Sequence, residues 1–461
     1  MVVYITDLPP ELHCAILDQA DEDSLQVTAL SLSRALPYSH IPKYYFFRHI
    51  RLKQAQQVIR LESHLRKSPE DAAIVETFAL WCWAVDADVF GAYFDSTLLA
   101  LSRWPRASLP TISVTQDTLN STIAPSGFAQ PLVFFRLEPL QTLARASYTS
   151  TVVNFRLRIP GREIAKYLAL HSRSLPSVEL LDLATSNVKQ NDISQLMFRL
   201  RNLRYLILDG CPLVSQRADA PEAAGAEALS QWMSLGKTMA CAGIDGTRAR
   251  ERKLKRWLEQ NYIAAPQEQA TEEQIQPRRV RRGRRGVATA TISLRASPPK
   301  TTTRLPSQSG HVNNQTPIPR IRILPPVPAL HSVTVTAPMI SPNGPEFDTR
   351  KEAMRVAFEQ GWAEGISMLQ NQRAIMRTSW GRGMRVVQFA PPDITLWEDC
   401  RETEDDGEEG LEGLVDLQTG EEFDLLDERG PTLCFAGPDR GINHAAGCAH
   451  EVGWRVFKDN L

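Results

Sequence analysis

A leucine pattern that occurs twice constrains the fold of this chain more than any other feature. The segments VELLDLATSNV (178–188) and LRYLILDGCPL (203–213) place apolar residues at the same spacing, 25 residues apart. In each segment, two leucines separated by one residue would point to the same side of a short strand. The intervening NDISQLMFRLRN (191–202) has the apolar spacing of an amphipathic helix. Two units in register predict a strand and a helix that repeat at a fixed interval.

Further strand and helix segments are expected on both sides of this pair. TVVNFRLRIPGREIAKYLALHSRSLP (151–176) precedes it, and ALHSVTVTA (329–337), a long amphipathic helix over 347–376 and MRVVQFAPP (384–392) follow it. Less regular strands are predicted within 73–85 and 109–116. The spacing resembles that of leucine-rich repeats. We therefore expect an α/β fold in which an irregular leucine-rich-repeat solenoid occupies 53–217 and resumes over 319–395.

Composition sets two other regions apart. Arg, Pro, Ser, Thr, Gln and Gly without periodicity fill the stretch from 266 to 315, so a largely disordered basic insertion is predicted over 218–318. Residues 396–461 are predicted to be an acidic segment followed by a C-terminal cap on the open end of the solenoid, with Trp454, Val456 and Phe457 docking there.

The insertion contains a basic block, RRVRRGRRG (278–286). Its arginines could form a nuclear-import signal, a patch with weak affinity for nucleic acid, or a solvated loop. The residues concerned are Arg278, Arg279, Arg281, Arg282, Arg284 and Arg285. No aromatic residues alternate with them, so nucleic-acid binding by base stacking is not expected.

The N-terminal segment ITDLPPELHCAILDQADEDSLQVTALSLSRAL (5–36) predicts two short helices. Asp7 could cap the first helix, and the acidic run at 21–24 could cap the second. The aromatic sequence YYFFRHIRL (44–52) then leads into a strand. A helical unit over 1–52 is too short to bury a large core by itself. We therefore expect its apolar faces to be completed by a partner.

This N-terminal arrangement resembles an F-box, with its Leu-Pro-x-Glu-Leu start, acidic turn and leucine-rich second helix. Together with the repeats it is similar to the F-box and leucine-rich-repeat family. The resemblance implies a substrate-recognition subunit of a Skp-cullin-F-box E3 ubiquitin ligase. Such a subunit binds a Skp-type adaptor and its cullin complex through the N-terminal helices and an unknown target protein through the repeats, for ubiquitin-dependent degradation. The implied adaptor-binding residues are Leu8, Pro9, Glu11, Leu12, Ile16, Leu17, Leu25 and Leu32.

Catalysis is not expected from this chain. No phosphate-binding glycine loop, nucleophile elbow or HExxH pattern occurs between a predicted strand and helix, which agrees with a non-catalytic ligase subunit. Cys434, His444, Cys448 and His450 are of the types that bind zinc, but they lack a CxxC pair or a matching HxxxH. Loop residues are the alternative interpretation, so no metal site and no cofactor are predicted.

Composition bounds the remaining expectations. Seven scattered cysteines without CxxC spacing favour a reducing compartment, so a nuclear or cytoplasmic location is expected. No run approaches the roughly 18 apolar residues of a membrane helix, so no membrane partner is predicted. The alternative function is a leucine-rich-repeat protein-binding scaffold, with a nuclear location as one option, that recruits no ligase and whose first helices only cap the stack.

Overall fold

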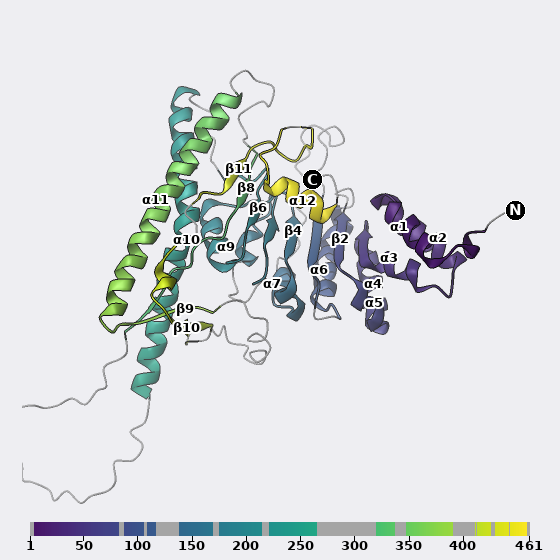
Figure 1. Cartoon of the computed structure of the whole chain (residues 1–461), viewed down its shortest axis with the longest axis horizontal. Helices are drawn as coiled ribbons and strands as arrows, with labels where there is room; N and C mark the ends of the chain where they lie inside the picture. The colour runs from purple at the N-terminus through teal and green to yellow at the C-terminus, as the bar shows by residue number, and fades with distance from the viewer. Residues whose placement is uncertain are drawn as a thin grey trace, which may run out of the picture.

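An eight-stranded sheet, in which every strand is parallel to its neighbours, organises the chain (Figure 1). Across the sheet its strands are β1 (His49–Leu52), β2 (Thr77–Cys82), β3 (Thr111–Gln116), β4 (Asn154–Arg158), β5 (Leu180–Asp182), β6 (Tyr205–Ile207), β8 (Ser332–Thr334) and β11 (Thr432–Cys434). This order follows the order of the chain. The computed structural model describes residues 4–82, 87–105, 108–116, 138–168, 175–213, 221–264, 320–336, 347–390, 411, 413–425, 429–441 and 443–458.

The two faces of this sheet differ in chemistry, because successive residues of a strand point to opposite faces. One row of cross-strand neighbours is apolar throughout and belongs to the main core: Ile50, Phe78, Ile112, Phe155, Leu181, Leu206, Val333 and Leu433. The next row, on the other face, is largely polar: Arg51, Ala79, Ser113, Arg156, Asp182, Ile207, Thr334 and Cys434. We call these faces the apolar face and the polar face.

A row of helices covers the apolar face, each packed against the next. These helices are α4 (Ala55–Lys67), α6 (Ala87–Ser102), α7 (Glu138–Ala144), α8 (Ala165–Leu168), α9 (Gln190–Arg199) and α10 (Pro221–Ala264). Leu65 of α4, Leu101 of α6 and Leu196 of α9 are fully buried in the same core as the strands. Two short segments, α5 (Pro69–Ile74) and the 3₁₀ turn η2 (Ser147–Thr151), lie in the connections. Sheet and helices thus share one hydrophobic core.

The two longest helices, α10 and α11 (Phe347–Gly381), lie side by side (Figure 1). Glycines let their backbones approach closely. A Cβ atom at Gly361 would lie 1.8 Å from the carbonyl oxygen of Met233, and one at Gly236 would lie 2.2 Å from that of Phe358. A side chain at either glycine would therefore force the two helices apart.

A second, three-stranded sheet packs against the same pair of helices. It consists of β7 (Ile321–Ile323), β9 (Arg385–Phe389) and β10 (Leu414–Asp416), with β9 parallel to β7 and antiparallel to β10. Leu254 and Leu258 of α10 pack on Val387, while Met376 of α11 packs on Val386 and on Phe423 of the 3₁₀ turn η4 (Glu421–Phe423). The helix pair therefore connects the two sheets.

The C-terminal helix α12 (Ala449–Phe457) lies on the polar face, in contact with β3, β5, β6 and β8. Phe457 packs with Leu180 and Ile207, and the Arg156 guanidinium lies 3.8 Å above its ring. Arg156 Nε donates to Asp182 Oδ2 at 2.8 Å, and Arg158 Nη2 donates to the same oxygen at 2.6 Å. Arg156 and Asp182 are buried, so helix α12 covers a charge pair that is shielded from water.

The α/β class expected from the sequence is confirmed, but the leucine-rich-repeat solenoid is wrong. The chain forms one large all-parallel sheet with helices, and a solenoid requires units of similar length. Here the interval between the starts of consecutive strands varies from 25 residues, between β5 and β6, to 127 residues, between β6 and β8. In addition, β7 and β9, within the region expected to resume the solenoid (319–395), form the separate sheet.

Three boundaries also differ from expectation. The predicted disordered insertion (218–318) is wrong over α10, whose Trp232, Leu235 and Met239 are buried at helical spacing; residues 265–319 lie outside the described residues. Phe457 is buried, as expected of a docked C-terminus, but α12 covers a sheet face rather than an open end. The last four residues of the expected helical unit (1–52) form β1 of the main sheet.

Candidate functional site

Three helices form a small unit beside β1, the edge strand of the sheet (Figure 1). They are α1 (Pro10–Gln19), α2 (Glu22–Ala35) and α3 (His40–Arg48). Pro10 stands at the first position of α1, where its fixed φ suits a helix and its missing N–H costs nothing. Asp21 caps α2, as expected from the acidic run, by accepting a hydrogen bond from the Ser24 N–H at 2.7 Å.

The start of the chain differs from the sequence prediction in one detail. Asp7 does not cap α1, because Pro9 occupies that position. Asp7 instead accepts a hydrogen bond from the Tyr4 N–H at 3.2 Å and closes a 3₁₀ turn, η1 (Ile5–Asp7). His13 of α1 contributes a second tie, since its Nε2 lies 2.9 Å from the Ile5 carbonyl oxygen. The turn η1 is therefore held against α1.

The residues that the F-box resemblance assigns to the adaptor fall into two groups. Leu17 and Leu32 are buried, and Leu25 packs with them in a small core that includes Tyr45 of α3. The Tyr45 hydroxyl donates to Asp18 Oδ1 at 2.7 Å, and this hydrogen bond raises the pKa of Tyr45 to about 12. Leu17 and Leu32 thus belong to the core that holds the three helices together, with Leu25 partly buried beside them.

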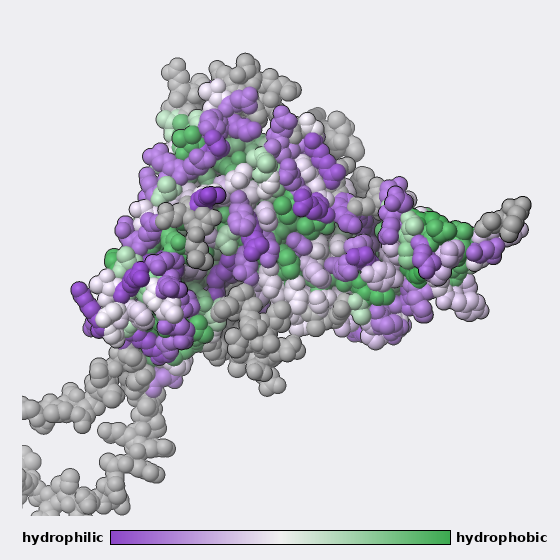
Figure 2. Space-filling view, in the orientation of Figure 1, coloured by the Kyte–Doolittle hydropathy of each residue, from purple (hydrophilic) through white to green (hydrophobic). Residues whose placement is uncertain are grey.

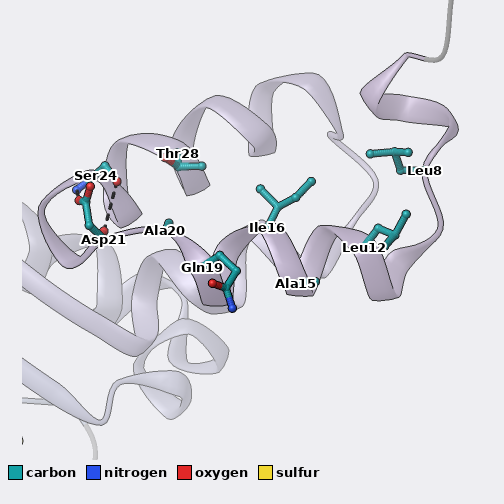
Figure 3. A pocket seen from close by; sticks show the side chains of 9 residues that line it. All are labelled: Leu8, Leu12, Ala15, Ile16, Gln19, Ala20, Asp21, Ser24 and Thr28. Carbon is teal, nitrogen blue, oxygen red and sulfur yellow. Dashed lines mark hydrogen bonds between the residues drawn. The ribbon is translucent and has the colours of Figure 1, made fainter.

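The second group is exposed along one side of α1. Leu12 is 47% exposed and Ile16 is 38% exposed, four residues apart, while Pro9 and Glu11 are exposed and Leu8 is half-buried. Leu12 and Ile16 project from the same side of α1, next to Leu8 (Figure 3). Hydrophobic surface gathers over these helices at one end of the molecule (Figure 2). We call Leu8, Leu12 and Ile16 the α1 strip.

The α1 strip lines an open groove of about 660 Å³ between α1 and α2. Its other lining residues are Ala15, Gln19, Ala20, Asp21, Ser24 and Thr28. The sequence analysis missed these residues, although Ala15 and Gln19 follow Leu12 at helical spacing and could have been found from that signal. The groove is apolar along α1 and polar at its α2 side, so it suits an amphipathic partner segment.

The unit is joined to the sheet through α3 and β1. Helix α3 packs on α5 and on β1, and Gln26 Nε2 of α2 donates to the His49 carbonyl oxygen at 3.1 Å. The Arg48 guanidinium adds an ion pair with Glu76 at 2.9 Å, just before β2. These contacts fix the α1 strip at the edge of the sheet while leaving it open to solvent.

The other sequence-predicted sites are placed as follows. The arginines of the proposed nuclear-import signal, Arg278 to Arg285, lie outside the described residues. Cys434, His444, Cys448 and His450, whose spacing in the sequence predicts no metal site, come together at the end of the polar face.

Comparisons with known proteins give no family for this chain. No family model, curated protein or solved structure matches it. Among the described residues, no helix combines the length and apolar character needed to cross a membrane.

Proposed function

We propose that the chain is a substrate-recognition subunit of a Skp-cullin-F-box E3 ubiquitin ligase, acting in the nucleus or cytoplasm. The observation that carries the proposal is the α1 strip, because it exposes apolar residues on a helix that starts with the Leu-Pro-Pro-Glu-Leu sequence. In this proposal a Skp-type adaptor covers the strip, and the rest of the chain holds a target protein. Transfer of ubiquitin belongs to other subunits of the ligase.

The division of the N-terminal leucines by burial supports this proposal. Leu17, Leu25 and Leu32 stabilise the helical unit internally, so the unit does not need the α1 strip for its own core. Full burial of a leucine side chain is worth about 1.5–3 kcal/mol. Covering the exposed parts of Leu12 and Ile16 would therefore supply roughly 1 kcal/mol each, and a central cluster of such anchors can dominate an interface.

The test is a binding titration of the full chain against a purified Skp-type adaptor. Changing Leu8→Ala and Pro9→Ala together should weaken binding at least tenfold, about 1.4 kcal/mol. Changing Leu12→Glu and Ile16→Glu should abolish it, since two carboxylates would be buried without partners. Both positions are exposed, so neither glutamate threatens the fold. The matched control is Ile375→Glu on α11, a position that is 61% exposed and far along the chain from the unit.

The same experiment tests a second candidate function. The three helices also cover the edge of the sheet, through the contacts of Gln26 and α3 with β1. A protein-binding scaffold that recruits no ligase would use the unit only for that purpose. Failure of the unchanged chain to bind the adaptor at micromolar concentration would favour this scaffold. Equal binding by the unchanged chain and by the Leu12→Glu/Ile16→Glu variant would remove the α1 strip from the proposal.

A further inference from the structure

Two cysteines and two histidines from separate segments meet at the end of the polar face. Cys434 is the last residue of β11, His444 lies in the loop that follows, Cys448 is the N-cap of α12 and His450 lies in its first turn. One ligand atom from each residue can be chosen so that all four lie within 4.8 Å of one another. Cys434, Cys448 and His450 are buried, and His444 is half-buried.

The distances within this cluster match a tetrahedral metal site. His444 Nδ1 lies 3.6 Å from Cys434 Sγ and 3.7 Å from Cys448 Sγ. In a tetrahedral zinc site, with Zn–S of about 2.3 Å and Zn–N of about 2.0–2.1 Å, a sulfur and a nitrogen ligand are separated by about 3.6 Å. A pairwise thiol hydrogen bond does not require four donors to meet, whereas a shared ion does, and all four lie within 4.8 Å of one another here.

The outer nitrogens of both histidines are already engaged, which orients the inner ones. His450 Nε2 lies 2.6 Å from Asp209 Oδ2, and His444 Nε2 lies 2.9 Å from the Asp439 carbonyl oxygen. Carboxylates and carbonyls in this position are the usual outer partners of metal-bound histidines. His450 Nδ1 is buried and has no hydrogen-bond partner among the described residues. A buried ring nitrogen without a hydrogen bond keeps its lone pair available for a metal ion.

Asp209 is itself held in place. It follows β6, and its Oδ1 accepts a hydrogen bond from the Thr336 hydroxyl at 2.9 Å. The Thr334 hydroxyl of β8 lies 3.4 Å from the other oxygen. Asp209 is nearly fully buried, so its carboxylate has a fixed position from which to orient His450.

We propose that Cys434, His444, Cys448 and His450 bind one zinc ion in a closed structural site. Two thiolates and two imidazoles at tetrahedral spacing are a donor set that zinc prefers. Four protein ligands leave no open position for substrate, so the ion has a structural role. It fixes α12 to the strand β11 at one end of the helix, while Phe457 anchors the other end over Arg156.

The first measurement is the metal content of the full chain, purified without chelator, by inductively coupled plasma mass spectrometry. We expect about one zinc per chain. Cys434→Ser should lose it, and so should His444→Asn, which changes a half-buried ligand and so puts the fold at less risk. Cys241→Ser, a free and half-buried cysteine on α10, is the matched control and should keep the metal.

Two further readouts separate the proposal from its competitors. The chain freed of metal and loaded with Co²⁺ should show the visible absorption bands of tetrahedral cobalt, and Cys434→Ser should remove them. Asp209→Asn, which changes a positioning residue, should lower zinc affinity about 10–100-fold in competition with a chromophoric chelator. The proposal is overturned if the unchanged chain contains no zinc and takes none up, or if peptide mapping finds Cys434 and Cys448 joined as a disulfide in the purified chain.

Discussion

The apolar and polar faces of the main sheet are made by the same strands, yet they are closed in different ways. A row of helices seals the apolar face, whereas the nine-residue helix α12 covers the polar face within the described part of the chain. Apolar burial is non-directional, so the first face accepts any helix with an apolar side. The second face buries the Arg156–Asp182 pair and Asp209, which need specific partners. We infer that the apolar face supplies most of the stability and the polar face determines where α12 lies.

The largest expected effect comes from breaking the buried charge pair. Asp182→Ala leaves Arg156 buried without its counter-charge, and such a change costs about 3–5 kcal/mol of unfolding free energy. Urea denaturation at pH 7 measures it. The control is Glu179→Ala, which removes a half-exposed partner of Arg204 and should cost less than about 1 kcal/mol. A loss for Asp182→Ala no larger than that of the control would contradict the assigned role of the polar face.

The same pair has a pH dependence with a defined sign. Burial alone would raise the pKa of Asp182, but the charges of Arg158 and Arg156 outweigh it and lower the pKa below its ordinary value. The stabilisation is therefore present above the unfolded-state pKa of about 3.9 and is lost as the pH falls below it.

The next effect tests the apolar face at the neighbouring residue. Leu181→Ala removes a fully buried side chain and should cost about 3 kcal/mol through lost burial and the cavity left behind. Because no ionisable group is involved, the loss should stay constant between pH 4 and pH 8 in urea denaturation. If the loss of unfolding free energy varied across this pH range, the packing of the apolar face would be coupled to the ionisable groups of the polar face.

A smaller effect is expected where α12 meets the charge pair. Phe457→Leu keeps most of the apolar volume but removes the ring beneath the Arg156 guanidinium, so we expect a loss of about 1–2 kcal/mol. A double-mutant cycle with Arg156→Met isolates the coupling between the two side chains. A coupling energy near zero would show that Phe457 holds α12 by burial alone.

The smallest effect concerns His49, at the β1 end of the polar face. Burial, with the nearby charges of Lys458 and Arg48, lowers the pKa of His49 to about 4. Between pH 6.5 and pH 4 the unfolded chain therefore binds a proton that the folded chain does not, and stability falls as the pH falls. The expected loss is on the order of 1 kcal/mol after solvent screening. His49→Gln should flatten this part of the profile, and an unchanged profile would assign the slope to other groups.

The sequence predicted local structure well where the period was clear. The strands β5 and β6 fall inside the two leucine segments and the helix α9 lies between them, because alternation and helical spacing are local properties. The same logic explains why the predicted adaptor-binding residues divide by burial. Leu17 lies five positions after Leu12, roughly 140° around the helix, so it faces the interior while Leu12 faces solvent.

What the sequence did not predict depends on contacts between distant segments. The helix α10 lies within the predicted disordered insertion (218–318), and its close packing on α11 at Gly236 involves residues more than one hundred positions later in the chain. The cysteine and histidine cluster has no known motif spacing, and its outer partner Asp209, which follows β6, lies more than two hundred residues earlier in the chain. Neither of these two contacts can be predicted from the sequence before the order of the strands is known.

The close contact of α10 with α11 has a mechanical consequence. At 1.5 Å per residue, the 44 residues of α10 span about 66 Å, and backbone meets backbone at Gly236 and Gly361. Bending either helix there would require main-chain atoms already in contact to slide past each other. The helix pair is therefore rigid, and it fixes the distance between the three-stranded sheet and the eight-stranded sheet.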